Sequence, residues 1–236
     1  AVSENVMAGT AMGRRGLYMY GALLPKGPEG QVDAGLGKGT AAGSVTLIPP
    51  TDLITRTGEE KVIDGVRIIF QYTPGTEAPT EMNFYFPQFK ALCMAENCSH
   101  TLHNLYTLRG AQVRDAKAWS YFLNEALDLF GDQAEVVFVS HHWPLMGKEN
   151  IRLWLKKQAN IYKFIHDQTL NLANKGCTMN EIAEILVLPD ELGKQWFNRS
   201  YYGTVNHDSK AVYQKYLGWF DGNPANLNPL PPVEAS

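Results

Sequence analysis

Carboxylate and imidazole side chains stand at the ends of three predicted strands in this sequence. Glu77 and Glu81 precede one strand, Glu96 follows a second, and the pair His141 and His142 follows a third. Strands are rigid and the loops at their ends bring side chains together, so such groups are typical of a site at a sheet edge. Carboxylate oxygen and imidazole nitrogen suit zinc and its first-row neighbours. Each residue alone is more often a solvated or packing side chain, and the spacing by itself leaves both interpretations open.

Two further stretches carry groups that could hold an anion or transfer a proton. HTLHNLYTLRG contains His100, His103, Asn104 and Arg109, and an amide beside a guanidinium can bind sulfate, phosphate or carboxylate. YYGTVNHDSK places His207 at a predicted helix start, where the helix dipole favours a bound anion. Taken alone, Arg109 would more often pair with a nearby acid, and His207 would more often belong to a capping turn.

The first half of the chain predicts short strands that could position these groups. In EEKVIDGVRIIFQYT, Asp64 and Gly65 stand between two β-branched runs, as in tight hairpins whose central residues need positive φ. Two more strands are predicted at 82–86 and 91–94. Residues 22–50 are rich in Gly and Pro and predict a long loop.

The middle of the chain predicts a helix followed by a strand. RDAKAWSYFLNEALDLFG has helical spacing and ends at Gly131. EVVFVS, at 135–140, is expected to be a short strand buried on both faces. The apolar face of the helix comprises Trp119, Phe122, Leu123, Leu127 and Phe130.

The second half predicts helices almost throughout. One long helix or two follow Glu149, the capping box Thr178 to Glu181 opens another, and a further helix is expected to open at Asp208 or Ser209. Strands first and helices later, with a strand–helix–strand middle, predict a mixed sheet flanked by helices.

The composition limits the class of protein. The chain has 236 residues, 44% of them hydrophobic and 19% charged, which is ordinary for a globular enzyme. Its net charge of −3 gives no sign of a nucleic-acid or anionic-membrane partner, and no apolar run is long enough to cross a bilayer. Cys93, Cys98 and Cys177 lack the C-x-x-C spacing of zinc or redox motifs and are interpreted as free thiols.

Four stretches together resemble one family. TPGTEAPTEMNFYFP, MAENCSHTLHNLYTLRGAQVRD, VFVSHHWPLMG and FNRSYYGTVNHDSKAVYQKYLGWFDGNP are similar to the alkyl sulfatases built on the metallo-β-lactamase fold, which hydrolyse alkyl sulfate esters including dodecyl sulfate. The resemblance implies two zinc ions per active site, held by an upstream H-x-H-x-D-H motif, two glutamates and a histidine. These last three map onto Glu77, Glu96 and His141, with Glu96 as the bridging ligand and His142 as a packing or supporting residue.

The resemblance also implies residues for the substrate. Asn104 and Arg109 match positions that contact the sulfate group, and His207 matches the general acid that protonates the leaving alcohol. The sequence has Asp208 where the family pattern has Asn, which is a departure beside the presumed acid.

No H-x-H-x-D-H occurs in the sequence, so the chain is expected to begin downstream of that motif. The predicted fold class is α/β: the C-terminal part of a metallo-β-lactamase-like αββα sandwich, followed by a helical segment. We expect the C-terminal part of the metallo-β-lactamase-like catalytic domain at 1–147 and the helical part of that domain at 148–221. Residues 222–236 are expected to be a linker toward a dimerisation domain after Ser236 that forms a homodimer. Family members are often periplasmic or secreted.

Three alternatives remain at this stage. Another hydrolase of the same fold would usually have His and Asp where this chain has Glu77 and Glu96. CTMNEIAEILVLPDEL has the outline of a helix-turn-helix, but the following element offers only Lys194 and Arg199 to DNA. A purely structural or interaction role is the third, although aromatic residues in the helices are more often core than interface.

Overall fold

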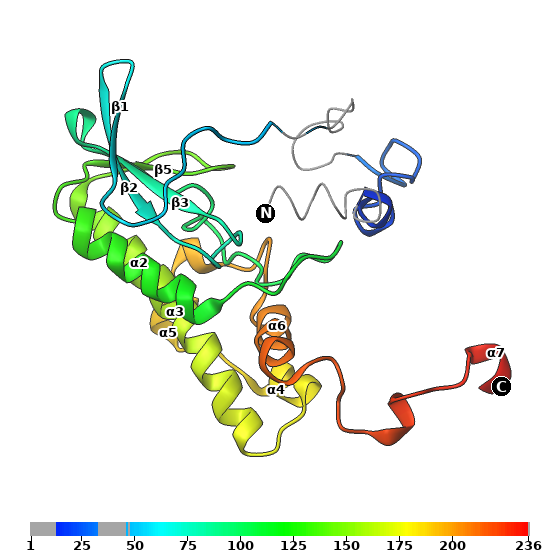
Figure 1. The fold of residues 1–236 in the computed structure, drawn as a ribbon. Helices are drawn as coiled ribbons and strands as arrows, with labels where there is room; N and C mark the ends of the chain where they lie inside the picture. Colours follow the sequence, from blue (N-terminus) through cyan, green and yellow to red (C-terminus); the bar gives the residue numbers. More distant parts are fainter. Residues whose placement is uncertain (1–12, 33–45, 47, 236) are drawn as a thin grey trace. The chain divides into compact units, whose positions relative to one another are not determined.

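The computed structural model of the chain describes residues 13–32, 46 and 48–235. The chain divides into two compact units, one formed by Ala1–Leu53 with Tyr106–Gln112, and one by Ile54–Leu105 with Val113–Ser236. The described part of the smaller unit includes a helix at 13–19. The larger unit contains a sheet and the helices that pack on it (Figure 1).

Among the described residues, six strands form one mixed sheet in the order β1-β2-β3-β4-β5-β6. Neighbouring strands are antiparallel except β4 and β5, which are parallel and are joined by a helical crossover. The strands are β1 (Glu60–Ile63), β2 (Val66–Tyr72), β3 (Met82–Phe86), β4 (Ala91–Cys93), β5 (Val136–Phe138) and β6 (Leu145–Met146).

Helices account for most of the second half. The long α3 is one continuous helix, and Thr178 and Glu181 form a complete capping box at the start of α4, as predicted. The helices are α2 (Ala116–Phe130), α3 (Lys148–Asn174), α4 (Met179–Ile185), α5 (Asp190–Gly193), α6 (Val205–Leu217) and α7 (Pro232–Ala235). Because α5 has only four residues, it is too short to be the recognition helix of a helix-turn-helix, and that alternative is wrong.

The hairpin prediction is confirmed. Asp64 and Gly65 connect β1 to β2 with φ of 50° and 78°, which is the geometry that Asp-Gly favours. The predicted start of the last long helix is wrong. α6 begins at Val205, because the Thr204 hydroxyl accepts a hydrogen bond from the His207 amide and caps the helix one turn earlier than Asp208 would.

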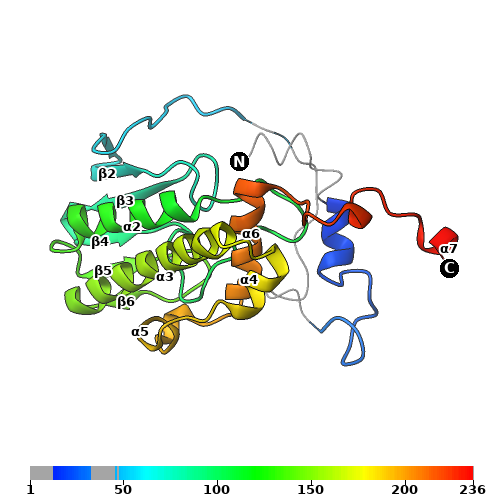
Figure 2. The ribbon, with the colours of Figure 1, turned by 90° about the horizontal axis from the view of Figure 1, so that it is seen from below.

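One face of the sheet packs on α2 and α3 (Figure 2). Tyr85 of β3 stacks on Phe130 of α2 with ring centroids 5.0 Å apart. Tyr85 pairs with Leu92 of β4, Leu92 pairs with Val137 of β5, and both Leu92 and Val137 are fully buried. Trp119 of α2 and Tyr162 of α3 stack at 4.7 Å with no exposed surface. This helix–sheet contact is the core of the larger unit.

The opposite face of the sheet is apolar and only partly covered. Phe86 stacks on Phe138 at 6.2 Å, and Phe70 meets Phe84 edge-on at 5.6 Å. Phe138 of β5 is 36% exposed, so the expectation that EVVFVS is buried on both faces is wrong. Within this segment Val137 and Val139 are buried by the described residues, with 0% and 8% of their surface exposed.

The remaining composition-based predictions agree with the structure. All three cysteines are free. Within the part of the chain that the structure describes, none of the helices is long and apolar enough to cross a membrane. The aromatic residues of the helical second half divide between core and surface. Trp154 and Tyr162 are fully buried, whereas Trp196, Tyr216 and Trp219 are substantially exposed.

Candidate metal and anion site

The parallel pair β4 and β5 ends in two turns that are tied together. Glu96 lies in the turn after β4, and His141 lies in the turn after β5. The Ser140 amide donates to the Ala95 carbonyl at 2.8 Å. Ala95 and His141 both have positive φ, 49° and 72°, a conformation that costs a non-glycine residue about 1–3 kcal/mol. One strained residue, Ala95, precedes the predicted ligand Glu96 and the other, His141, is itself a predicted ligand, which supports a functional interpretation of this edge.

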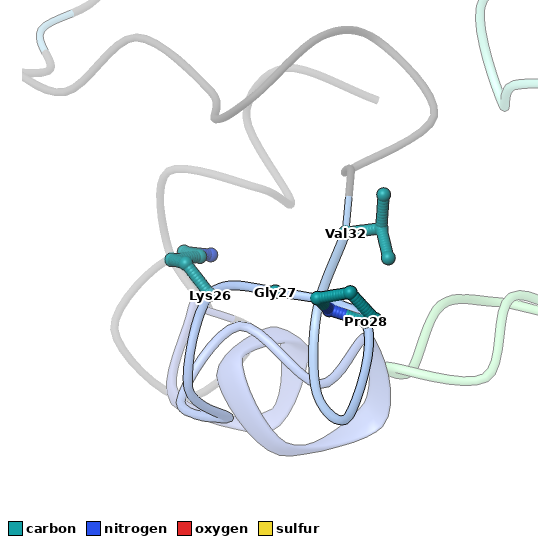
Figure 3. Close-up of a pocket in the computed structure, with 4 residues that line it drawn as sticks. All are labelled: Lys26, Gly27, Pro28 and Val32. Carbon is teal, nitrogen blue, oxygen red and sulfur yellow. The ribbon is translucent and has the colours of Figure 1, made fainter.

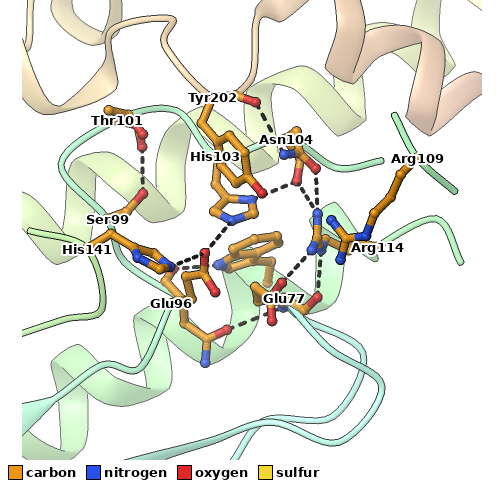
Figure 4. A network of polar contacts seen from close by, with 12 residues as sticks. Glu77, Glu96, Ser99, Thr101, His103, Asn104, Arg109, Arg114, His141 and Tyr202 are labelled. Carbon is orange, nitrogen blue, oxygen red and sulfur yellow. Dashed lines mark hydrogen bonds and ion pairs between the residues drawn. The ribbon is translucent and has the colours of Figure 1, made fainter. Parts of the chain in front are cut away.

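The side chains converge on one carboxylate. His141 Nε2 lies 3.1 Å and His103 Nε2 lies 3.4 Å from the same oxygen of Glu96 (Figure 4). One ligand atom each of Glu77, Glu96 and His103 lies within 4.8 Å of the others. Glu96 therefore lies close to each of the other two predicted ligands, Glu77 and His141, but the group of mutually close ligand atoms contains His103 in place of His141. His103 is not among the ligands predicted from the sequence.

The hydrogen bonds of His103 test whether a cation fits here. Its Nδ1 lies 2.8 Å from the carbonyl oxygen of Asn104, which can only accept, so Nδ1 carries the hydrogen. A neutral ring then presents the Nε2 lone pair to the Glu96 carboxylate, and two acceptors face each other. A metal ion or a proton satisfies both. Two carboxylates and two imidazoles are a donor set that suits zinc.

The hydrogen bond with His103 is the main influence holding the pKa of Glu96 below the usual value, and the charges of His103, His141 and Arg114 add to it. Glu81 behaves in the opposite way. Burial, together with the neighbouring carboxylates Glu77 and Glu96, raises the pKa of Glu81 to about 7.

Arg114 holds the loop carrying Glu77 against the loop carrying Asn104. Its guanidinium forms an ion pair with the Glu77 carboxylate, and its Nε donates to the Glu77 carbonyl at 2.6 Å. Its Nη1 donates to both the backbone and side-chain oxygens of Asn104. Because the Arg114 side chain is only 10% exposed, these contacts are shielded from solvent.

Asn104 is itself buried and fixed from a second side. Its Nδ2 donates to the Tyr202 carbonyl at 3.2 Å, and the Tyr202 ring lies edge-on to His103 at 4.7 Å. Both ends of the Asn104 amide therefore make protein contacts. Its predicted role in binding sulfate stays a prediction.

The start of α6 is attached to the same loop. The Leu105 amide donates to Asp208 Oδ1 at 2.8 Å, and the Gly203 amide donates to the Leu102 carbonyl at 3.0 Å. Asp208 is fully buried, and burial raises the pKa of its carboxyl well above the usual value. His207 lies in the first turn of α6 beside this attachment, and its role as general acid stays a prediction.

Arg109 belongs to the smaller unit. Its Nη1 donates to the Tyr20 hydroxyl at 3.3 Å. The same unit has a pocket lined by Lys26, Gly27, Pro28 and Val32 (Figure 3). This lining offers neither a carboxylate nor an imidazole, so we assign it no chemistry.

Two residues of the site have no role among the sequence-based predictions. His103 and Arg114 lie in the same stretch as Asn104 and Arg109. The presence of a second histidine and a second arginine in that stretch was the only sequence feature that pointed to them. Which of each pair faces Glu77 and Glu96 depends on how the loop crosses the end of the sheet. Spacing along the chain does not encode that.

Known proteins similar to this chain are alkyl sulfatases. A protein-family model described as alkyl sulfatase dimerisation matches residues 178–236. A linear primary-alkylsulfatase of Pseudomonas sp. is 57% identical over 99% of this chain and 35% of its own length. An alkyl/aryl-sulfatase of Saccharomyces cerevisiae is 53% identical over 98% of this chain and 36% of its own length.

A solved alkylsulfatase structure is also similar to this chain. That of the stereoselective inverting sec-alkylsulfatase Pisa1 from Pseudomonas sp. matches with a TM-score of 0.92 and 50% identity, over 100% of this chain and 37% of that one. Over its whole length the chain is similar to alkyl sulfatases, and the predicted fold class is confirmed. It spans about a third of the length of the relatives it matches.

The family match also bears on the domain layout. The sequence predicts a dimerisation domain after Ser236, whereas the matched residues 178–236 include α4, α5, α6 and α7 of this chain. The predicted boundaries at 147 and 221 remain predictions.

Proposed function

We propose that the intact protein hydrolyses alkyl sulfate esters, such as dodecyl sulfate, to an alcohol and inorganic sulfate at a binuclear zinc site. The observation that carries the proposal is the convergence of His141, His103 and Glu77 on the Glu96 carboxylate. Sequence identity of 50–57% to proteins named alkylsulfatases supports the substrate class.

Within this chain, Glu77, Glu96 and His141 would hold the metal. Bound zinc supplies a Lewis acid and lowers the pKa of water. Arg114 keeps the Glu77 carboxylate in place, and the paired turns after β4 and β5 keep Glu96 and His141 in contact. Half-exposed His141 leaves this edge open to solvent and to a substrate.

The polar residues beyond the ligands would act on the ester. Asn104 and Arg109 would bind the sulfate group, whose charge grows as the ester bond breaks. His207 would donate a proton to the oxygen of the departing alcohol, a role worth about 10²–10⁴ in rate.

Metal content and turnover, measured together on the intact protein, test these roles. Glu96→Ala should lose zinc, and His207→Ala should keep zinc while sulfate release from dodecyl sulfate falls by about 10²–10⁴. Glu149→Ala, an exposed glutamate at the start of α3, is the control and should change neither. The ligand assignment is wrong if Glu96→Ala retains a full complement of zinc. The substrate class is wrong if the zinc-loaded protein releases no sulfate.

We also propose that the intact protein is a homodimer. The match of residues 178–236 to an alkyl sulfatase dimerisation model supports this proposal. Light scattering after size-exclusion chromatography should give twice the protomer mass. A monomer at micromolar concentration would contradict it.

A further inference from the structure

Three buried side-chain amides link α2 to the loop that carries Glu77. Asn97 Oδ1 accepts from the Glu77 amide at 3.4 Å, and Asn97 Nδ2 donates to Asn83 Oδ1 at 2.9 Å. Asn83 Nδ2 donates to Gln71 Oε1 at 2.8 Å. Gln71 Nε2 donates to the Phe122 carbonyl of α2 at 2.8 Å. We call Gln71, Asn83 and Asn97 the amide relay.

The direction of the amide relay is fixed at both ends. Gln71 Nε2 also lies 2.8 Å from a carboxylate oxygen of Glu125, so the α2 end offers only acceptors. The other end is the backbone N–H of Glu77, which can only donate. Rotating any amide by 180° would place like groups against each other. Each relay residue must therefore remain an amide in its present orientation.

Burial makes this requirement strict. Gln71 and Asn83 have no exposed surface and Asn97 has 2%. The spare hydrogen on Asn97 Nδ2 is taken by Thr73 Oγ1 at 3.0 Å. A buried network in which every member is satisfied is rigid, and an unsatisfied member is costly because water cannot replace the lost partner.

Asn97 also holds the turn of its neighbour Glu96 through its main chain. Its amide donates to the Met94 carbonyl at 2.8 Å, and its carbonyl accepts from Trp119 Nε1 of α2 at 2.6 Å. One residue therefore binds the Glu96 turn with its backbone and the Glu77 loop with its side chain.

We propose that Asn97 is a positioning residue that sets the separation of Glu77 and Glu96, and that the amide relay transmits its orientation from α2. The proposal concerns the metal site and so rests on the proposed function. It assigns no contact between Asn97 and substrate or metal.

The test replaces relay amides by carboxylates of the same shape. In Asn97→Asp, an oxygen replaces Nδ2 and faces Asn83 Oδ1, and the fixed direction of the relay prevents Asn83 from turning to donate. Asn83→Asp breaks the relay one step further from the site. Asn198→Asp is the matched control: Asn198 is equally buried, and the change removes one bond from Nδ2 to the Leu192 carbonyl, outside the relay.

Two readouts separate positioning from general stability. Without metal, hydrogen exchange of the peptide covering residues 73–82 should become about tenfold faster in both relay variants and stay unchanged in Asn198→Asp. In the intact protein, zinc affinity should fall about 10- to 100-fold in Asn97→Asp and not in Asn198→Asp.

The proposal is overturned if residues 73–82 exchange at the unsubstituted rate in both relay variants. Equal acceleration in the control would also overturn it, because a general loss of stability would then explain the effect. If the unsubstituted intact protein binds no zinc, the proposed function fails, and metal-free exchange alone decides whether Asn97 positions the loop.

Discussion

Replacing Gly203 with alanine should destabilise the fold where α6 is attached to the site. A Cβ at residue 203 would lie 2.6 Å from the Asn104 nitrogen, 2.7 Å from the His103 carbonyl carbon and 2.8 Å from the Asn104 Cα. Favourable separations between such atoms are about 3.5–4.0 Å. All three neighbours are backbone atoms, so no change of rotamer can relieve the clash.

The cost can be worked out in two ways. Overpacking at a site that cannot relax costs about 1–3 kcal/mol. Moving the Gly203 backbone away would instead lose its 3.0 Å bond to the Leu102 carbonyl and the 3.2 Å bond from Asn104 to Tyr202, about 1 kcal/mol each. Both routes give about 2 kcal/mol, which for a chain of this size lowers Tm by about 4–8 °C.

Thermal unfolding followed by circular dichroism measures the effect, with Gly193→Ala as the control. A Cβ at residue 193 would meet only the Leu188 Cβ, at an ordinary 3.6 Å, so that variant should keep its Tm within about 2 °C. If Gly203→Ala also keeps its Tm within about 2 °C of the unsubstituted value, the close approach of Gly203 to the backbone of His103 and Asn104 is refuted.

Three further measurements address individual groups. Asp115→Ala removes the cap that accepts from the Ala118 amide of α2 and should cost about 1 kcal/mol by urea unfolding, whereas Asp115→Asn should keep most of the stability. Burial lowers the pKa of His100 from 6.5 to about 4, so the unfolded chain binds a proton there first and stability is lost as the pH falls through this window. Between pH 7 and pH 4.5, the free energy of unfolding of His100→Phe should therefore fall by about 2 kcal/mol less than that of the unsubstituted chain. Equal falls would exclude a buried neutral imidazole. The pKa of Glu81, about 7 when folded, has the opposite consequence: its stabilising contribution is present below pH 4.5 and is lost as the pH rises through 7. In the presence of a chelator, Glu81→Gln should be more stable than the unsubstituted chain at pH 8 but not at pH 4.5. A gain in stability that does not depend on pH would contradict the raised pKa of Glu81.

Local structure was predictable where only one nearby residue could form the turn or the helix cap. Asp64 and Gly65 determine the hairpin because both adopt positive φ, and Gly131 ends α2 where the apolar spacing stops. The start of α6 was not predicted correctly, because Thr204 and Asp208 are both good capping residues. Tertiary structure decides between them: Asp208 is buried and accepts from the Leu105 amide, which leaves Thr204 to cap the helix.

The residue types of the candidate site could be read from the sequence, but their contacts only in part, and their roles stay predictions. The resemblance selected Glu77, Glu96 and His141, and the structure brings them to one edge of the sheet. The ion pair between Arg114 and Glu77 joins residues 37 positions apart. That contact depends on how the loops cross the sheet, which the spacing of residues along the chain does not encode.

The single parallel pairing in the sheet implies an order of events during folding. Strands β1 to β4 pair antiparallel with their neighbours in sequence and can form through local contacts. Pairing of β5 with β4 requires α2 to be in place, and such long-range closure is slow. His141 therefore reaches Glu96 only after the crossover has closed. A partly folded chain would display Glu77 and Glu96 without His141, so the proposed metal site would be completed only late in folding.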